Sequence, residues 1–170
     1  MKVLSRHVVP VIAILSLGCQ DASSPPSERT AFGSRTSVWQ PDPSAAIAHE
    51  YYSGLVDAAD LVIADSQTWA VIWARLNAGR QPDPPFPAVD FGTERVILVA
   101  LGQRNSGGYD IRIDSVVHFQ RGSVTYVTAT APGDRCVTTQ ALTQPVDVIR
   151  LARGVEPMAF QRRAVVRDCS

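Results

Sequence analysis

The sequence predicts an α+β fold, mainly an antiparallel β-sheet or sandwich, with one main α-helix at about residues 66–78. Two observations support this prediction. Apolar runs of strand length, either alternating or continuous, follow one another from about residue 94 to the end of the chain. Only one earlier window has helical spacing, and no strand–helix alternation follows it, which argues against a parallel α/β fold.

The helix is predicted within the first part of the folded domain. The stretch "YYSGLVDAADLVIADS" predicts two short strands joined by a turn at Asp57–Asp60, after which Asp65 or Ser66 can cap a helix. Gly79 lies where a glycine would end that helix. Its apolar positions recur at helical spacing and form the predicted buried face: Trp69, Ile72, Trp73 and Leu76.

Strands dominate the rest of the chain. The four prolines of "RQPDPPFPAVD" exclude regular structure and predict an extended loop. "ERVILVALG" is a nearly continuous apolar run, which predicts a central strand. Further strands are predicted at "YDIRIDSVVHF", "GSVTYVTATAP", "DVIRLAR" and "PMAFQRRAVVRD".

The N-terminus has the features of an export signal, which we assign to residues 1–18. A positive head precedes a ten-residue apolar stretch, too short for the roughly 20 residues that span a bilayer. The following "LSLGC" resembles the lipoprotein box, with cleavage between Gly18 and Cys19 and a lipid on Cys19. Ser16 and Leu17 depart from the usual pattern, and ordinary signal peptidase cleavage at the same bond is the alternative.

The cysteine count bears on this choice. Three cysteines in an exported chain leave one over, so a lipid on Cys19 allows Cys136 and Cys169 to pair. Free thiols at these two positions are the alternative. We expect a protein of the bacterial cell envelope, lipid-anchored to a membrane on its periplasmic or outer surface. Residues 19–47 are then a lipidated N-terminus and flexible linker, and residues 48–170 form the domain. Trp39 lies within the linker and is a candidate to dock on the domain.

The stretch "NSGGY" has two interpretations. A phosphate-binding loop needs glycines that open a helix, but these glycines precede a strand and lack the Lys-Ser that would follow. We therefore interpret "GQRNSGG" as the turn of a β-hairpin that joins two strands.

The chain from about residue 51 to 160 resembles the PrcB family, at its C-terminal domain. Gly102 follows an apolar strand, and Ser106-Gly107-Gly108-Tyr109 resembles the family's (Thr/Ser)-Gly-Gly-Tyr element. The helix around "SQTWAVIW" is similar to the family's tryptophan-containing helix. Three further elements complete the resemblance: Pro132-Gly133, Gln140 and Thr143-Gln144-Pro145.

The resemblance implies a non-enzymatic accessory protein that binds or stabilises another exported protein, with a protease complex as the candidate partner. We select Ser106, Gly107, Gly108 and Tyr109 as candidate partner-binding residues, since a tyrosine beside glycines offers an aromatic anchor. A direct protease inhibitor and an uncharacterised hydrolase are the alternatives. The basic residues near the C-terminus either meet a partner carboxylate surface or protect a strand edge: Arg150, Arg153, Arg162, Arg163 and Arg167.

Composition disfavours other functions. Beyond Cys19 the chain has 14 Arg against 16 Asp and Glu, so no positive footprint for nucleic acid is expected. Beyond the signal peptide only His49 and His118 remain; we interpret the first as solvated and the second as a half-exposed strand residue. A trio of Ser106, His118 and Asp110 lacks a nucleophile elbow. We predict no catalytic residues, no metal and no cofactor.

Overall fold

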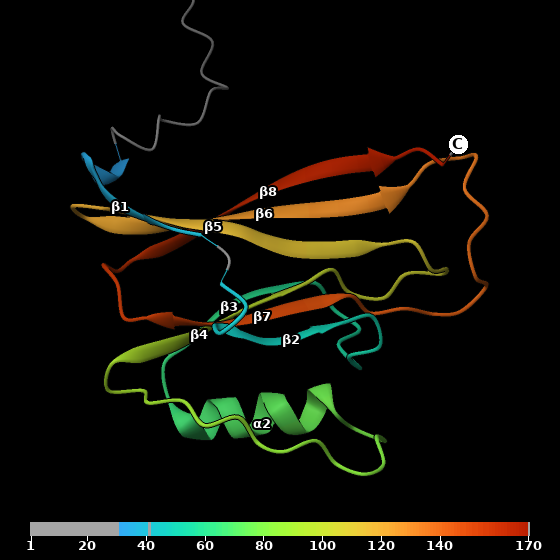
Figure 1. The fold of residues 1–170 in the computed structure, drawn as a ribbon, viewed down its shortest axis with the longest axis horizontal. Helices are drawn as coiled ribbons and strands as arrows, with labels where there is room; N and C mark the ends of the chain where they lie inside the picture. The colour runs from blue at the N-terminus through green and yellow to red at the C-terminus, as the bar shows by residue number, and fades with distance from the viewer. Residues whose placement is uncertain (1–30, 41, 170) are drawn as a thin grey trace, which may run out of the picture.

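The computed structural model of the protein describes residues 31–40 and 42–169. Two four-stranded sheets pack face to face, and a single labelled helix lies below them (Figure 1). Sheet A has the order β1-β5-β6-β8 and sheet B the order β2-β7-β4-β3. This arrangement confirms the predicted α+β sandwich. The elements are β1 (Arg35–Trp39), β2 (Ala46–Glu50), β3 (Ala59–Ile63), α2 (Ser66–Leu76), β4 (Glu94–Ala100), β5 (Asp110–Phe119), β6 (Gly122–Pro132), β7 (Val146–Ala152) and β8 (Met158–Arg167).

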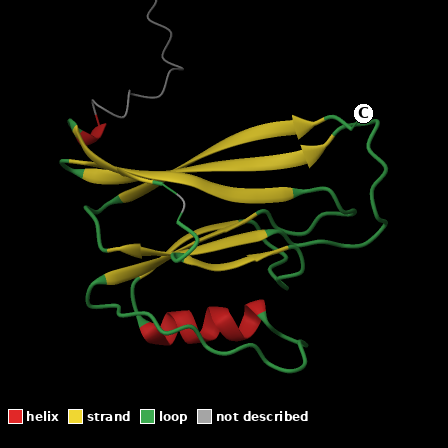
Figure 2. Ribbon diagram, viewed as in Figure 1, coloured by secondary structure: helices red, strands yellow, loops and turns green. Residues whose placement is uncertain are grey.

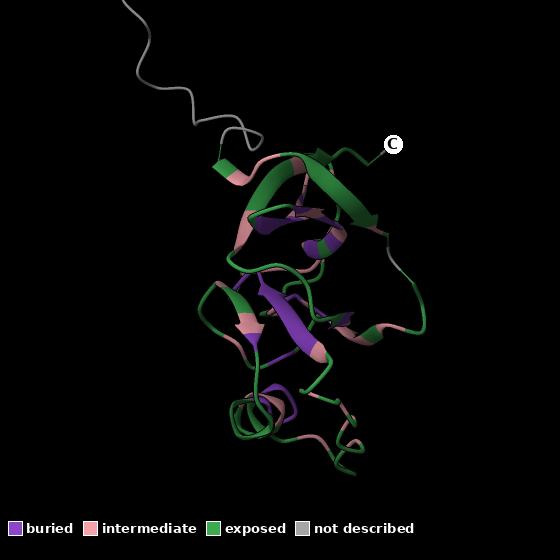
Figure 3. Cartoon of the chain, turned by 90° about the vertical axis from the view of Figure 1, so that its left-hand side faces the viewer, coloured by how far each residue is buried: buried purple, intermediate pink, exposed green. Residues whose placement is uncertain are grey.

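Two hydrophobic layers hold the molecule together. The first fills the space between the sheets and includes Ile97, Ile111, Val127 and Leu151. The second lies between sheet B and α2, which covers the sheet's outer face (Figure 2). Buried residues gather in the sheets and on the inner side of the helix (Figure 3). Strand β4 contributes to both layers, which explains why its sequence is a continuous apolar run.

Helix α2 follows the sequence prediction closely. Asp65 is its N-cap, and its carboxylate accepts a hydrogen bond from the Thr68 backbone N–H at 2.7 Å. Trp69 is fully buried and Leu76 is buried, so the tryptophan at the start of the stripe belongs to the core. The helix ends at Leu76, two residues before the predicted end, with Asn77 as the C-cap.

The predicted hairpin around the glycine pair is wrong. Strands β4 and β5 lie in different sheets, so residues 101–109 cross from sheet B to sheet A. The reason is that β4 pairs with β3 on one side and β7 on the other. No edge of β4 remains for β5, which pairs instead with β1 and β6.

The predicted linker is also corrected. Strand β1 and the first two residues of β2 lie within residues 19–47, so the folded domain begins earlier than predicted. Trp39 packs against the core between the sheets, as its selection as a docking residue predicted. Phe32 packs on Phe119 with ring centroids 6.0 Å apart, which holds the chain before β1 on sheet A. Of the two strands predicted within residues 51–66, only β3 forms; Tyr52 makes a single bridge to Gln144.

Two features of the C-terminal part follow from the chain's path. The ladder of β6 with β8 is parallel, whereas the other strand ladders are antiparallel. Cys136 and Cys169 form a disulfide, with Cα atoms 5.0 Å apart. It joins the loop after β6 to the chain after β8. The predicted signal peptide and the cleavage and lipidation site at Gly18 and Cys19 lie outside the described residues.

No helix among the described residues is long and apolar enough to cross a membrane.

Candidate functional site

The family-like motifs meet at one end of the sandwich. The loop at residues 101–109 and the segment at residues 132–145 lie together at the right-hand end of Figure 1, close to the C-terminus. Arg104 and Thr143 exchange two backbone hydrogen bonds, of 2.8 and 3.0 Å. The Thr143 hydroxyl also donates to the Ser106 carbonyl at 2.8 Å. We call these contacts the loop lock.

The two glycines are part of the loop lock. The Gly107 N–H donates to the Thr139 carbonyl at 2.9 Å, and a Cβ at Gly107 would lie 2.5 Å from the Thr139 hydroxyl. Gly108 has φ +86°, and its Cβ would lie 3.0 Å from a Pro132 side-chain atom. Both positions therefore require glycine for steric reasons. The glycine pair holds two loops together, and it does not open a helix.

Tyr109 is half-buried and belongs partly to the core. Its side chain packs against the cluster between the sheets. The guanidinium carbon of Arg104 lies 5.7 Å from the centre of its ring, a cation–π distance. Of the four residues selected as partner-binding, Tyr109 alone offers a large side chain to a ligand, and much of that side chain is already engaged.

A groove of about 310 Å³ lies beside the loop lock. Tyr51 and Tyr52 follow β2 directly and are 42% and 58% exposed, which is unusual for large aromatic side chains beside a groove. We call this cavity the tyrosine groove. It is lined by Tyr51, Tyr52, Gly108, Tyr109, Asp110, Thr143 and Arg167.

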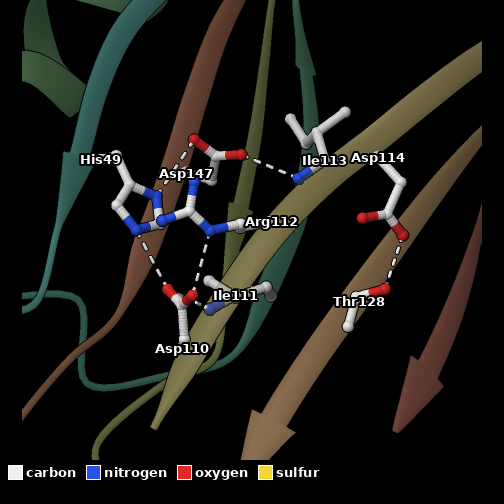
Figure 4. Close-up of polar contacts among 8 residues, drawn as sticks. All are labelled: His49, Asp110, Ile111, Arg112, Ile113, Asp114, Thr128 and Asp147. Atoms are coloured by element: carbon white, nitrogen blue, oxygen red, sulfur yellow. Dashed lines mark hydrogen bonds and ion pairs between the residues drawn. The ribbon is translucent and has the colours of Figure 1, made fainter. Parts of the chain in front are cut away.

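A charged network adjoins the groove through Asp110, which lines the groove and belongs to the network drawn in Figure 4. The Nε2 atom of His49, on β2, lies 3.0 Å from Asp110 Oδ1, and its Nδ1 atom lies 3.4 Å from Asp147 Oδ1. Arg112 Nε lies 3.1 Å from Asp110 Oδ2. His49 is therefore not the solvated residue that the sequence predicted, because the two sheets bring carboxylates from β5 and β7 to its ring.

The carboxylates of the network also accept hydrogen bonds from backbone N–H groups along the first half of β5, where β1 does not pair. Among the described residues, β1 pairs only with the second half of β5, from Val116 onward. In the first half, Asp110 Oδ1 accepts from the Ile111 N–H at 3.0 Å, and Asp147 Oδ2 accepts from the Ile113 N–H at 2.7 Å (Figure 4). The carboxylates thus replace a neighbouring strand and protect this edge from pairing with another chain.

The two histidines have opposite pKa shifts. The hydrogen bond to Asp147 is the main reason that the pKa of His49 is raised, and the nearby Asp110 carboxylate adds to it. Burial lowers the pKa of His118, which lies 2.8 Å from the Ser123 hydroxyl. Compared with a free histidine, His49 therefore keeps its proton to a higher pH, and His118 loses its proton at a lower pH.

The catalytic trio considered from the sequence is spread along the molecule. Asp110 and His118 lie eight residues apart on β5, roughly 26 Å at the rise of a strand. Ser106 lies at the Asp110 end, so the trio considered from the sequence does not assemble. No group of three metal-ligating side chains lies together within residues 31–169 as far as they are described.

Comparison with protein families bears on the same loops. Residues 95–152 match the family model described as PrcB C-terminal. This part of the chain is therefore similar to the PrcB C-terminal domain. The match runs from β4 to β7, a shorter range than the resemblance predicted, and it includes the loop lock. Within the tyrosine groove the PrcB match includes Gly108, Tyr109, Asp110 and Thr143, whereas Tyr51, Tyr52 and Arg167 lie outside it. Searches of curated proteins and of solved structures gave no match.

Sequence reasoning did not select Tyr51 and Tyr52 as site residues. Tyr51 and Tyr52 stood in the sequence as a tyrosine pair beside a predicted strand, a signal that could have drawn attention to them. Arg167 is one of five arginines predicted to form a basic C-terminal face, and two of the other four are paired with carboxylates. Arg162 pairs with Asp60 at 2.7 Å, and Arg150 lies 3.5 Å from Glu94. Pairing removes these two arginines from any common surface.

Proposed function

We propose that this protein is a non-enzymatic, membrane-tethered lipoprotein whose loop end binds another exported protein, with a protease complex as the candidate partner. The PrcB C-terminal match supports an accessory role associated with such a complex. The observation that carries the proposal is the tyrosine groove, because exposed aromatic side chains around a concavity are typical of protein-binding sites.

The position of the groove suits a tethered binding domain. The described chain begins near Phe32, at the end of sheet A opposite the loop lock (Figure 1). A lipid on Cys19 would leave the eleven residues 20–30 as the tether, which span at most about 37 Å when fully extended. In this proposal the lipid holds one end of the domain near the membrane, and the groove faces away from the attachment point.

Site-specific crosslinking in the native host tests the proposal. Tyr52 is replaced by the photo-crosslinking residue p-benzoylphenylalanine in the full-length chain, and the products are identified by mass spectrometry. Val71, which is 68% exposed on the outside of α2, provides the matched control position. We expect one exported protein, a protease or its associated subunit, to crosslink from position 52 and not from position 71.

Equal crosslinking from both positions, or none from position 52, would contradict the proposal. The tether is tested separately by metabolic labelling with a radioactive fatty acid. Labelling that disappears in Cys19→Ser supports lipidation, and an unlabelled wild-type protein excludes it.

A further inference from the structure

The tyrosine groove contains a cation, Arg167, that has no side-chain partner among the described residues. Arg167 lies at the end of β8, and its guanidinium makes no ion pair or side-chain hydrogen bond with the described residues. Its backbone is nevertheless fixed, since its carbonyl accepts from the Gly133 N–H at 2.9 Å. The disulfide at Cys169 follows two residues later. The guanidinium of Arg167, with five N–H donors, is therefore carried by an ordered backbone and lines the same groove as three tyrosine rings.

The acid in the same groove is already engaged. Asp110 contacts His49 and Arg112 through opposite oxygens, and it accepts the Ile111 N–H. Its charge is balanced within the protein, so it has little attraction left for a ligand. The unbalanced charge among the residues that line the groove is the positive charge of Arg167. This favours an anionic group over a cationic one.

The remaining surfaces favour an apolar neighbour for that anion. Tyr51 and Tyr52 each present exposed ring surface, and Tyr109 supplies a third wall. Exposed apolar side chains continue around the same end of the molecule, with Leu142 at 54% and Val166 at 65% exposure. An extended peptide fits this pattern better than a small inorganic anion, which would leave the aromatic surface uncovered.

We propose that the tyrosine groove binds an extended peptide segment of a partner, with a carboxylate on Arg167 and an adjacent apolar side chain on the rings of Tyr51 and Tyr52. This inference rests on the proposed binding function and names the chemistry that the partner must present. The carboxylate is either a peptide C-terminus or an acidic side chain, since Arg binds both in the same bidentate geometry.

The four tyrosines of the chain provide a direct readout. Tyr51, Tyr52 and Tyr109 line the groove, whereas Tyr126 lies on β6 away from it and serves as an internal control. The full-length protein is labelled with ¹³C in its tyrosine rings and titrated with peptides while the ring signals are recorded by NMR. Three probes share an acetylated Pro-Leu start: one ends in glycine with a free carboxylate, one in glutamic acid amide, and one in glycine amide.

We expect the carboxylate probes to shift the three groove tyrosines and leave Tyr126 in place. The neutral amide should bind about tenfold more weakly, the effect of one charge-assisted contact at an exposed site. Arg167→Gln should remove the difference between charged and neutral probes. Arg163→Gln is the matched control, because Arg163 lies on the same strand outside the groove and should leave the difference unchanged.

Comparing the two charged probes identifies the source of the carboxylate. Equal binding of all three probes, no groove shifts with any of them, or an unchanged preference in Arg167→Gln would overturn the inference. A different result, the absence of a crosslink from position 52, would contradict the proposed function. A crosslinked partner that is captured equally by Arg167→Gln would preserve the function and reject the carboxylate chemistry.

Discussion

The loop lock and the tyrosine groove lie side by side and differ in how their residues are used. In the loop lock, Gly107, Gly108 and Thr143 are engaged by neighbouring loops through hydrogen bonds and close contacts. In the groove, Tyr52 and Arg167 are exposed. The family match includes these three residues of the loop lock and neither of the two exposed ones. The difference suggests that the family motif builds a scaffold, on which residues outside the motif set what is bound.

Removing the disulfide should have the largest effect on this scaffold. Replacing Cys136 and Cys169 with serine frees a loop of 33 residues and should lower the free energy of unfolding by about 3–4 kcal/mol. Thermal and urea denaturation measure the change. A loss well below about 1 kcal/mol would show that the loops are held without the disulfide, and would weaken the view of this end as a fixed scaffold.

Gly108→Ala should be the next most damaging change. Its φ of +86° strains an L-residue, and the added methyl group would press on Pro132 and Thr138, so we expect a loss of about 2–3 kcal/mol. Gly79→Ala is the matched control, because Gly79 has φ +83° and no atom within 4 Å of the added Cβ. Equal losses in the two variants would mean that backbone strain alone matters and the contact with the neighbouring loop does not.

Replacing Tyr109 should affect both stability and partner binding, whereas replacing Tyr52 should affect mainly partner binding. Tyr109→Ala removes a half-buried ring from the core and should cost about 1–2 kcal/mol, whereas Tyr52→Ala should change stability by less than about 0.5 kcal/mol. Partner crosslinking from position 51 should fall in both variants. If Tyr109→Ala kept full stability, the residue would belong functionally to the groove alone.

The smallest expected effect is a pH dependence of stability that links the groove to the charged network adjoining it. The folded-state pKa of His49 is raised above 6.5, so its contribution to stability is present below that pH and is lost as the pH rises through the folded pKa. His118 has a lowered pKa, so its contribution is present above pH 6.5 and is lost as the pH falls.

Urea denaturation of His49→Gln and His118→Gln between about pH 5 and 9 separates the two effects. The first variant should lack the stability loss on the alkaline side, and the second should lack the loss on the acidic side. Since the rings of Tyr51 and His49 form a T-shaped pair with centroids 5.5 Å apart, the Tyr51 NMR signal should follow the titration of His49. A Tyr51 signal that ignores this titration would show that the network and the groove are independent.

The sequence by itself determined the local features of this protein. Helical spacing located α2 to within two residues of its observed end, and apolar runs located β4 to β8. Periodicity could do this because it reports which faces of an element are buried. The cysteine pair was also predictable, since only two cysteines remain once Cys19 is set aside.

Only the tertiary structure decided which elements meet. The pairing of β4 with β3 and β7 sent β5 to the other sheet, although a hairpin was the simpler prediction from adjacent strands. His49 gained its carboxylate partners from residues 61 and 98 positions later in the chain, a distance that no local pattern encodes. The exposure of Tyr52 and of Arg167 follows from the same packing. The physical reason is that burial and pairing depend on neighbours brought together by the fold.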